Sequence, residues 1–268
     1  MTAPAGTVLG GELAARRRTL ALWCLSLAAV TVLYTSFYPS VGGSKADALL
    51  ANLPADVVTA LGFDDLGTAA GYVSSTVFSL LGAVLTLVCT IGLGAGLVAG
   101  AEEDGTLELE LAAPVSRSRV YLERLALLWL AAAALATTVV VVLGVLALAL
   151  DLDLTPGRLA AAGLALALFG GALGTVALGL GAATGRRAVA LAGGAALAVL
   201  GYVLAYVGPL VDGAGWVRHL SPYDWYIGAE PLATGVDERG GALLVALAVL
   251  AGALGLVVFR RRDLLAQR

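Results

Sequence analysis

The sequence predicts an all-α membrane protein that crosses the bilayer six times, and its composition and its apolar runs both point to this fold class. Its 268 residues are 60% hydrophobic and 13% charged, whereas soluble domains are about 45–50% apolar and about 25% charged. Mean hydropathy is +0.94. A soluble core must be wrapped in polar surface, and this chain has too little of it. Each of six long runs lacks Asp, Glu, Lys, Arg and His, and about 20 apolar residues suffice to cross the hydrocarbon layer as a helix.

The six predicted spans follow one another along the chain with short breaks between most of them. They cover residues 19–41, 72–100, 125–150, 159–183, 188–211 and 241–259. Gly92, Gly96 and Gly100 repeat at every fourth residue, as do Gly170 and Gly174, and small residues at that spacing favour close helix packing in lipid. No long-period repeat or polar linker divides the chain, so we expect a single transmembrane domain over residues 1–268.

Basic residues predict the orientation of the spans. If the N-terminus is inside, twelve of the 16 Lys and Arg residues lie on the cytoplasmic side, and the remainder are Lys45, Arg158, Arg218 and Arg239. Lys and Arg near span ends favour the cytoplasm. Both termini and residues 101–124 are therefore expected to face the cytoplasm.

Local sequence patterns indicate helical structure in three segments outside the spans: residues 9–18, residues 46–61 and the last outer loop. Leu9–Arg18 forms either a short helix on the inner membrane surface or a frayed tail. In the first outer loop, residues 46–61 have helical spacing of apolar residues, interrupted by Pro54.

The last outer loop, residues 212–240, is predicted to contain one or two short helices that dip back toward the membrane. Ser221 is a capping residue, Pro222 suits a first helical position and Asp224 suits the first turn. Pro231 interrupts the helix. We interpret its aromatic residues as anchors at the lipid–water boundary; they are Trp216, Tyr223, Trp225 and Tyr226.

Missing residue types exclude several functions. The spans contain no ionisable residue, which argues against a proton- or sodium-coupled carrier. The single Lys45 is followed by Ala46, so the chain has no Walker A loop. The single His219 provides neither paired metal ligands nor a Ser–His pair within the bilayer. We therefore expect no catalytic, metal or cofactor site, and Cys24 and Cys89 to be small buried hydrophobes.

A charged segment separates the second and third spans. It reads Ala101-Glu-Glu-Asp-Gly-Thr-Leu-Glu-Leu-Glu-Leu-Ala-Ala-Pro-Val-Ser-Arg-Ser-Arg119. Gly105 permits a sharp turn, and Thr106 is expected to cap a helix that starts at Leu107. The alternation of Leu and Glu is equally typical of a short strand. Pro114 ends the element, and Ser116 is expected to cap the next helix. Charge alone favours a plain solvated loop.

The ordered pattern Glu102-Glu-Asp-Gly-Thr-Leu-Glu-Leu followed by Pro114-Val-Ser-Arg resembles the cytoplasmic coupling segment of ABC-2 type permeases. The resemblance covers the whole chain in layout, and it favours an N-terminal elbow helix at residues 9–18 and a re-entrant outer segment before the last span. It implies the membrane-spanning subunit of an ABC exporter in a prokaryotic cytoplasmic membrane. That subunit pairs with an ATPase subunit, which holds ATP and Mg²⁺, and with a second permease in a homo- or heterodimer. Nucleic acid is not an expected partner.

The resemblance also implies which residues contact the ATPase. Leu107, Leu109 and Leu111 offer apolar anchors for the partner, and Glu102, Glu103 and Asp104 can pair with its basic groups. The full set is Glu102, Glu103, Gly105, Thr106, Leu107, Glu108, Leu109, Pro114, Val115, Ser116 and Arg117. The alternative function is a membrane scaffold or assembly protein that transports nothing.

One face of the second span carries small polar residues, at Ser75, Ser79, Gly82, Thr86 and Thr90. They either line a translocation path or bond back to carbonyls of their own helix.

Overall fold

The computed structural model describes residues 8–41, 66–112, 115–211 and 213–262, and every regular element in this part of the chain is helical. Six helices are long and apolar enough to cross a membrane, which confirms the predicted fold class. They are Gly10–Val41, Ala69–Glu103, Arg117–Ala149, Pro156–Thr184, Arg187–Leu210 and Glu238–Arg261. The predicted helix over residues 46–61 lies outside the described residues.

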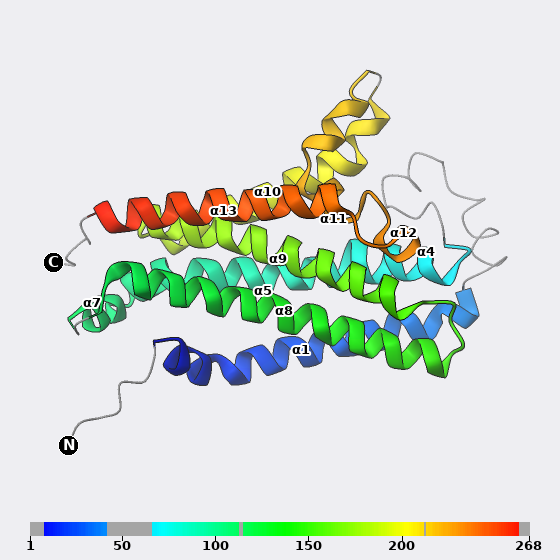
Figure 1. The fold of residues 1–268 in the computed structure, drawn as a ribbon, viewed down its shortest axis with the longest axis horizontal. Coiled ribbons are helices and arrows are strands. Elements are labelled where there is room, and N and C mark those ends of the chain that lie inside the picture. Colours follow the sequence, from blue (N-terminus) through cyan, green and yellow to red (C-terminus); the bar gives the residue numbers. More distant parts are fainter. Residues whose placement is uncertain (1–7, 42–65, 113–114, 212, 263–268) are drawn as a thin grey trace.

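The helices form one elongated bundle (Figure 1). In chain order they are α1 (Val8–Val41), α4 (Ala69–Val73), η1 (Ser74–Gly82), α5 (Ala83–Ala95), η2 (Gly96–Gly100), α6 (Ala101–Glu103), α7 (Thr106–Leu111), α8 (Arg117–Ala149), α9 (Pro156–Thr184), α10 (Arg187–Tyr206), η3 (Gly208–Leu210), η4 (Gly215–Leu220), α11 (Pro222–Ile227), α12 (Pro231–Thr234) and α13 (Glu238–Arg261). The predicted helix over residues 9–18 exists, but it continues into the first span without a break.

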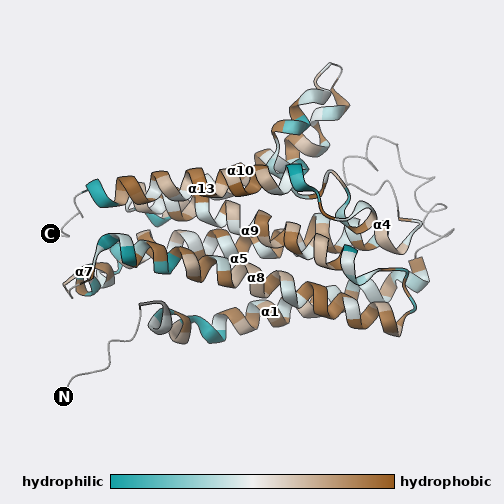
Figure 2. Cartoon of the chain, viewed as in Figure 1, coloured by the Kyte–Doolittle hydropathy of each residue, from teal (hydrophilic) through white to brown (hydrophobic). Residues whose placement is uncertain are grey.

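The two ends of the bundle differ in what they carry. Figure 1 shows the start of α1, the end of α13 and α7 at one end, called the inner end here, and α4, α11 and α12 toward the opposite, outer end. This arrangement places the first residues of α1, the last residues of α13 and the charged segment at the same end of the bundle, as the predicted orientation requires. In Figure 2 the hydrophilic colour gathers at the helix ends, and apolar residues dominate the lengths between them.

Helix α9 lies at the centre and packs against α5, α8, α10 and α13. In its most apolar window 67% of the residues are buried, against 17% for α1 and for α10. The peripheral helices expose Leu and Val side chains such as Leu25, Val199 and Leu200. Lipid tails are as apolar as these side chains, so an exposed apolar face is expected there.

Close contact between α5 and α9 depends on glycine. A Cβ at Gly94 would overlap the carbonyl oxygen of Gly174, and one at Gly170 would lie 2.7 Å from Cγ2 of Thr86. The predicted packing role of Gly170 and Gly174 is therefore confirmed. For Gly92 the prediction is wrong within this chain, because a Cβ added there would meet no atom within 4 Å.

The second span widens near its outer end. Residues Ser74–Gly82 form a π-helix, followed by regular α-helix. A Cβ at Gly82 would overlap the carbonyl oxygen of Val77, five residues earlier, so glycine permits the wide turn. Such turns are rare in proteins, but where they occur they often lie at functional sites.

Candidate functional site

The charged segment is helical and continues directly from the second span. After α6, Gly105 adopts a left-handed conformation with φ of 71°, and α7 begins at the next residue. The choice between helix and strand is thus decided for helix. Thr106 does not cap α7, which corrects our expectation, because its hydroxyl donates to the carbonyl oxygen of Ala101 at 3.1 Å. The turn is made by Gly105 and needs no side-chain cap.

The start of α8 follows the prediction more closely. Ser116 caps it, and its hydroxyl accepts a hydrogen bond from the amide of Arg119 at 3.3 Å. The guanidinium of Arg117 donates to the carbonyl oxygen of Arg262 at 2.6 Å, at the end of α13. Val115 is half-buried against the inner part of the core, and Pro114 lies outside the described residues.

Two of the leucines expected to anchor a partner, Leu107 and Leu109, differ in exposure. Leu109 is 77% exposed, whereas Leu107 is completely buried in the core of its own chain. Leu107 is therefore a core residue, and its expected contact with a partner is wrong. Between Ala101 and Glu110 the exposed residues are Glu103, Asp104, Thr106, Glu108 and Leu109.

Arg124 joins three helices at the inner end. Its side chain is fully buried, and its Nη2 lies 2.7 Å from Oε2 of Glu110 on α7 and 3.8 Å from Oε1 of Glu12 on α1. Glu12 also pairs with Arg16 at 2.8 Å. A buried cation without its partner is strongly destabilising. These contacts therefore hold α7 against α1 and α8.

A second ionic contact joins the segment to the last span. Glu102 is buried and pairs with Arg262, while Glu103 accepts a hydrogen bond from the amide of Arg187 at 2.8 Å. Glu102 was expected to face a partner, but it is occupied within the chain. Sequence reasoning missed these contacts, because the pair Glu102–Arg262 is 160 residues apart and nothing local indicates it.

At the outer end, the last loop packs back into the bundle as predicted. Ser221 caps α11 by accepting from the amide of Tyr223 at 2.9 Å, and its own hydroxyl donates to the carbonyl oxygen of Gly201 at 2.6 Å. Pro222 occupies the first turn of α11, as expected. The loop is thus tied to the end of α10.

Two tyrosines of α11 bind the main chain of the second span. The hydroxyl of Tyr223 donates to the carbonyl oxygen of Ser79, and that of Tyr226 donates to the carbonyl oxygen of Phe78 at 3.1 Å. Burial raises the pKa of both hydroxyls well above the ordinary value, so they stay protonated donors. Both side chains are buried in protein, so interpreting them as lipid anchors was wrong; Trp216, 64% exposed, still fits that role.

Aromatic rings complete the outer packing. Phe169 of α9 stacks on Tyr226 with ring centroids 4.6 Å apart, and its ring meets Tyr223 edge-on at 5.1 Å. Tyr202 and Tyr206 of α10 add further edge contacts to Tyr223. The cluster joins α9, α10 and α11 by neutral groups alone.

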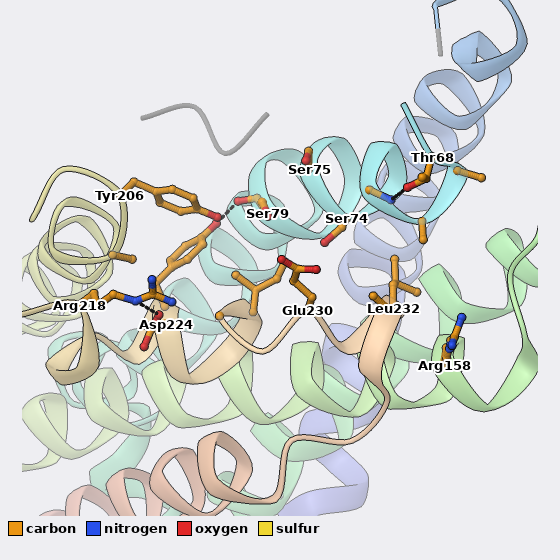
Figure 3. A pocket seen from close by; sticks show the side chains of 18 of the residues that line it. Thr68, Ser74, Ser75, Ser79, Arg158, Tyr206, Arg218, Asp224, Glu230 and Leu232 are labelled. Carbon is orange, nitrogen blue, oxygen red and sulfur yellow. Dashed lines mark hydrogen bonds and ion pairs between the residues drawn. The ribbon is translucent and has the colours of Figure 1, made fainter. Parts of the chain in front are cut away.

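A cavity of about 570 Å³ opens at this end between the second span, the end of α10, α11–α12 and the turn before α9 (Figure 3). Ser75 and Ser79 line it. Thr86 and Thr90 do not, since both are buried where α5 meets α9. The hydroxyl of Thr90 donates to the carbonyl oxygen of Thr86 at 3.0 Å. Thr90 therefore follows the alternative in which a hydroxyl bonds back to its own helix. The polar face predicted along the second span is thus divided between two environments.

Comparison with known families agrees with this architecture. The family model described as multidrug efflux system permease Rv1217c, C-terminal domain, matches residues 6–260, a stretch that includes all six spans, the charged segment and the outer cavity. The chain belongs to this family. It is therefore a transport permease of the ABC-2 type, a multi-pass protein of the cell membrane built for efflux. No curated protein matches the chain.

Proposed function

We propose that this permease is the membrane-spanning subunit of an ATP-driven ABC exporter and that a separate ATPase docks on the inner end of its second span. The observation that carries the proposal is that one helix connects the outer cavity with the charged segment. One helix, Ala69–Glu103, runs from the outer cavity to the exposed acidic turn before α7. The sequence has no Walker A loop of its own.

The exposed part of the segment suits a protein partner. Leu109 projects an exposed apolar side chain next to the exposed Glu108, with Glu103 and Asp104 nearby in sequence. An apolar anchor surrounded by charges of one sign fits an apolar pocket with a basic rim. The partner supplies ATP and Mg²⁺, and the permease catalyses no reaction itself.

The inner ion pairs give such docking a mechanical consequence. When the ATPase moves α7, Glu110 and Arg124 transmit the movement to α8, and Glu12 transmits it to α1. Through Glu102 and Arg262 the same movement reaches α13. Helices on both sides of the bundle thereby respond to one contact. A second permease, identical or related, completes the transporter.

Affinity purification of the permease from its native host, followed by mass spectrometry and an ATPase assay, tests the proposal. The wild type is expected to retain a soluble protein with a Walker A loop, and its ATPase activity is expected to co-purify. The double variant Glu108→Gln, Leu109→Ala is expected to lose at least about tenfold of that partner. It is expected to express normally, because both side chains are exposed.

The matched control is Leu148→Ala, Glu238→Gln, which removes an exposed leucine and an exposed acid outside the charged segment. It is expected to retain the ATPase. Absence of any co-purified ATPase, together with normal membrane insertion and no transport, would favour the scaffold function instead.

A further inference from the structure

The outer cavity has the size and chemistry of a ligand site. We propose that it binds an organic cation carrying N–H donors and that Glu230 provides the charge that holds this cation. The proposal rests on the proposed function in one respect, because it identifies the bound cation as the class of cargo that the exporter releases. Pockets of about 300–1,000 Å³ hold drug-sized ligands, and this one measures about 570 Å³.

The balance of charge in the cavity favours a cation. Asp224 is already neutralised, because the guanidinium of Arg218 lies 3.1 Å from its carboxylate. The other charged lining residues are Asp153, Arg158 and Glu230. Figure 3 shows Glu230 beside Ser74 of the second span, with Arg158 farther along the cavity. Glu230 is exposed and has no ion pair among the described residues, and together with Asp153 it outnumbers Arg158, so these three residues leave one net negative charge at the cavity.

Buried hydroxyls provide an independent observation. Ser75 and Ser79 are each 6% exposed and line the cavity. Among the described residues, neither side chain has a hydrogen-bond partner. Because both hydroxyl oxygens open onto the cavity, they can bond there to water or to a polar ligand. Hydroxyl oxygens accept from N–H groups, and the nearby carboxylate accepts too.

The remaining lining suits the apolar part of such a ligand. Tyr206 and Tyr223 contribute aromatic rings, and Ile227 and Leu232 contribute aliphatic surface. Aromatic faces attract cations through their quadrupole. Lining residues of the second span extend from Thr68 to Ser79, roughly 15 Å along a helix, so an elongated molecule fits better than a bare ammonium ion.

The backbone at Glu230 is held in a conformation that glycine adopts more readily. Its φ is 53°, in the left-handed region where residues with a Cβ are uncommon. Its amide donates to the carbonyl oxygen of Ile227 at 2.9 Å, and its own carbonyl oxygen accepts from the amide of Ala233 at 2.8 Å. Asp151 shares this conformation with a φ of 52°, and backbone strain of this kind is enriched at functional sites. Glu230→Gly is therefore expected to raise the melting temperature while it removes the carboxylate.

Equilibrium binding of two xanthene dyes to the purified full-length permease, without any ATPase, tests the site. Rhodamine 123 is a cation with N–H groups, and fluorescein is an anion of the same ring system. The wild type is expected to bind rhodamine 123 at least about tenfold more tightly than fluorescein. Glu230→Gln is expected to weaken rhodamine binding about tenfold, and Ser79→Ala about threefold. The control Glu238→Gln, outside the cavity, is expected to bind like the wild type.

Equal affinity for the two dyes, or no detectable binding of rhodamine 123, would overturn the proposal. Unchanged affinity in Glu230→Gln and Glu230→Gly would overturn it too. If Glu230→Gln fails to fold, rhodamine 123 binding is measured in two other variants instead. These are Glu230→Gly, which relaxes the backbone, and Ser79→Ala. Because no ATPase is present, loss of dye binding leaves the proposed function intact, and failure to co-purify an ATPase leaves the dye site intact.

Discussion

The inner and outer ends of the bundle are joined by opposite kinds of contact. At the inner end, the buried Arg124 and the pair Glu102–Arg262 link helices through charge. At the outer end, Tyr223 and Tyr226 link helices through neutral hydroxyls and rings, beside a cavity. Breaking a buried ion pair costs several kcal/mol, whereas a neutral hydrogen bond contributes about 1 kcal/mol. We therefore expect the helices of the outer end to separate at a lower cost than those of the inner end.

The largest expected effect is at Arg124. Arg124→Ala leaves Glu110 and Glu12 without their common partner, so we expect a loss of about 3–5 kcal/mol, a fall in melting temperature on the order of 10 °C. Thermal unfolding in detergent measures it. The control is Arg119→Ala, whose pair with Glu123 is exposed and contributes less than about 1 kcal/mol. Equal effects of the two variants would contradict the special role of the inner charges.

The second-largest effect is expected where helices α5 and α9 touch. Gly94→Ala forces α5 away from Gly174 of α9, and overpacking of this kind costs about 1–3 kcal/mol. Gly92→Ala, two residues away, meets no neighbouring atom and is expected to leave stability unchanged or raise it by up to about 1 kcal/mol. Melting temperatures of the two variants are compared. A similar loss in both would mean that α5 and α9 do not approach at Gly94.

A smaller effect is expected from the outer hydroxyls. Tyr226→Phe removes the hydrogen bond to Phe78 and is expected to cost about 1 kcal/mol. Tyr121→Phe is its matched control, because the buried hydroxyl of Tyr121 has no partner in the described part of the chain; its removal is expected to be neutral or stabilising. Chemical or thermal unfolding separates the two. If Tyr121→Phe proves the more harmful, the outer end depends on something other than these hydrogen bonds.

The smallest effect concerns the predicted path-lining face, which stays a prediction. Ser79→Ala, at the cavity, is expected to lower efflux of a transported dye about twofold to tenfold. Thr86→Val keeps the shape of a side chain buried between α5 and α9 and is expected to leave efflux unchanged. Whole-cell dye efflux measures both. Unchanged efflux in Ser79→Ala would remove the second span from the path at that position.

The sequence by itself determined the six spans, because apolar runs free of charge have no stable place except lipid. It also determined the caps at Ser116 and Ser221, since a capping side chain bonds within its own first turn. The family pattern likewise lies in one continuous stretch, Glu102–Arg117. Features of this kind depend on neighbours along the chain and are predictable from them.

Only the tertiary structure decided which residues of the charged segment face outward. Leu107 and Leu109 are alike in sequence, yet one is buried and the other 77% exposed, because α7 turns one face toward the core. Glu102 pairs with Arg262, 160 residues away, and Tyr226 meets Phe78 from the opposite part of the chain. Packing of helices distant in sequence sets these partners, and local pattern has no means of choosing among them.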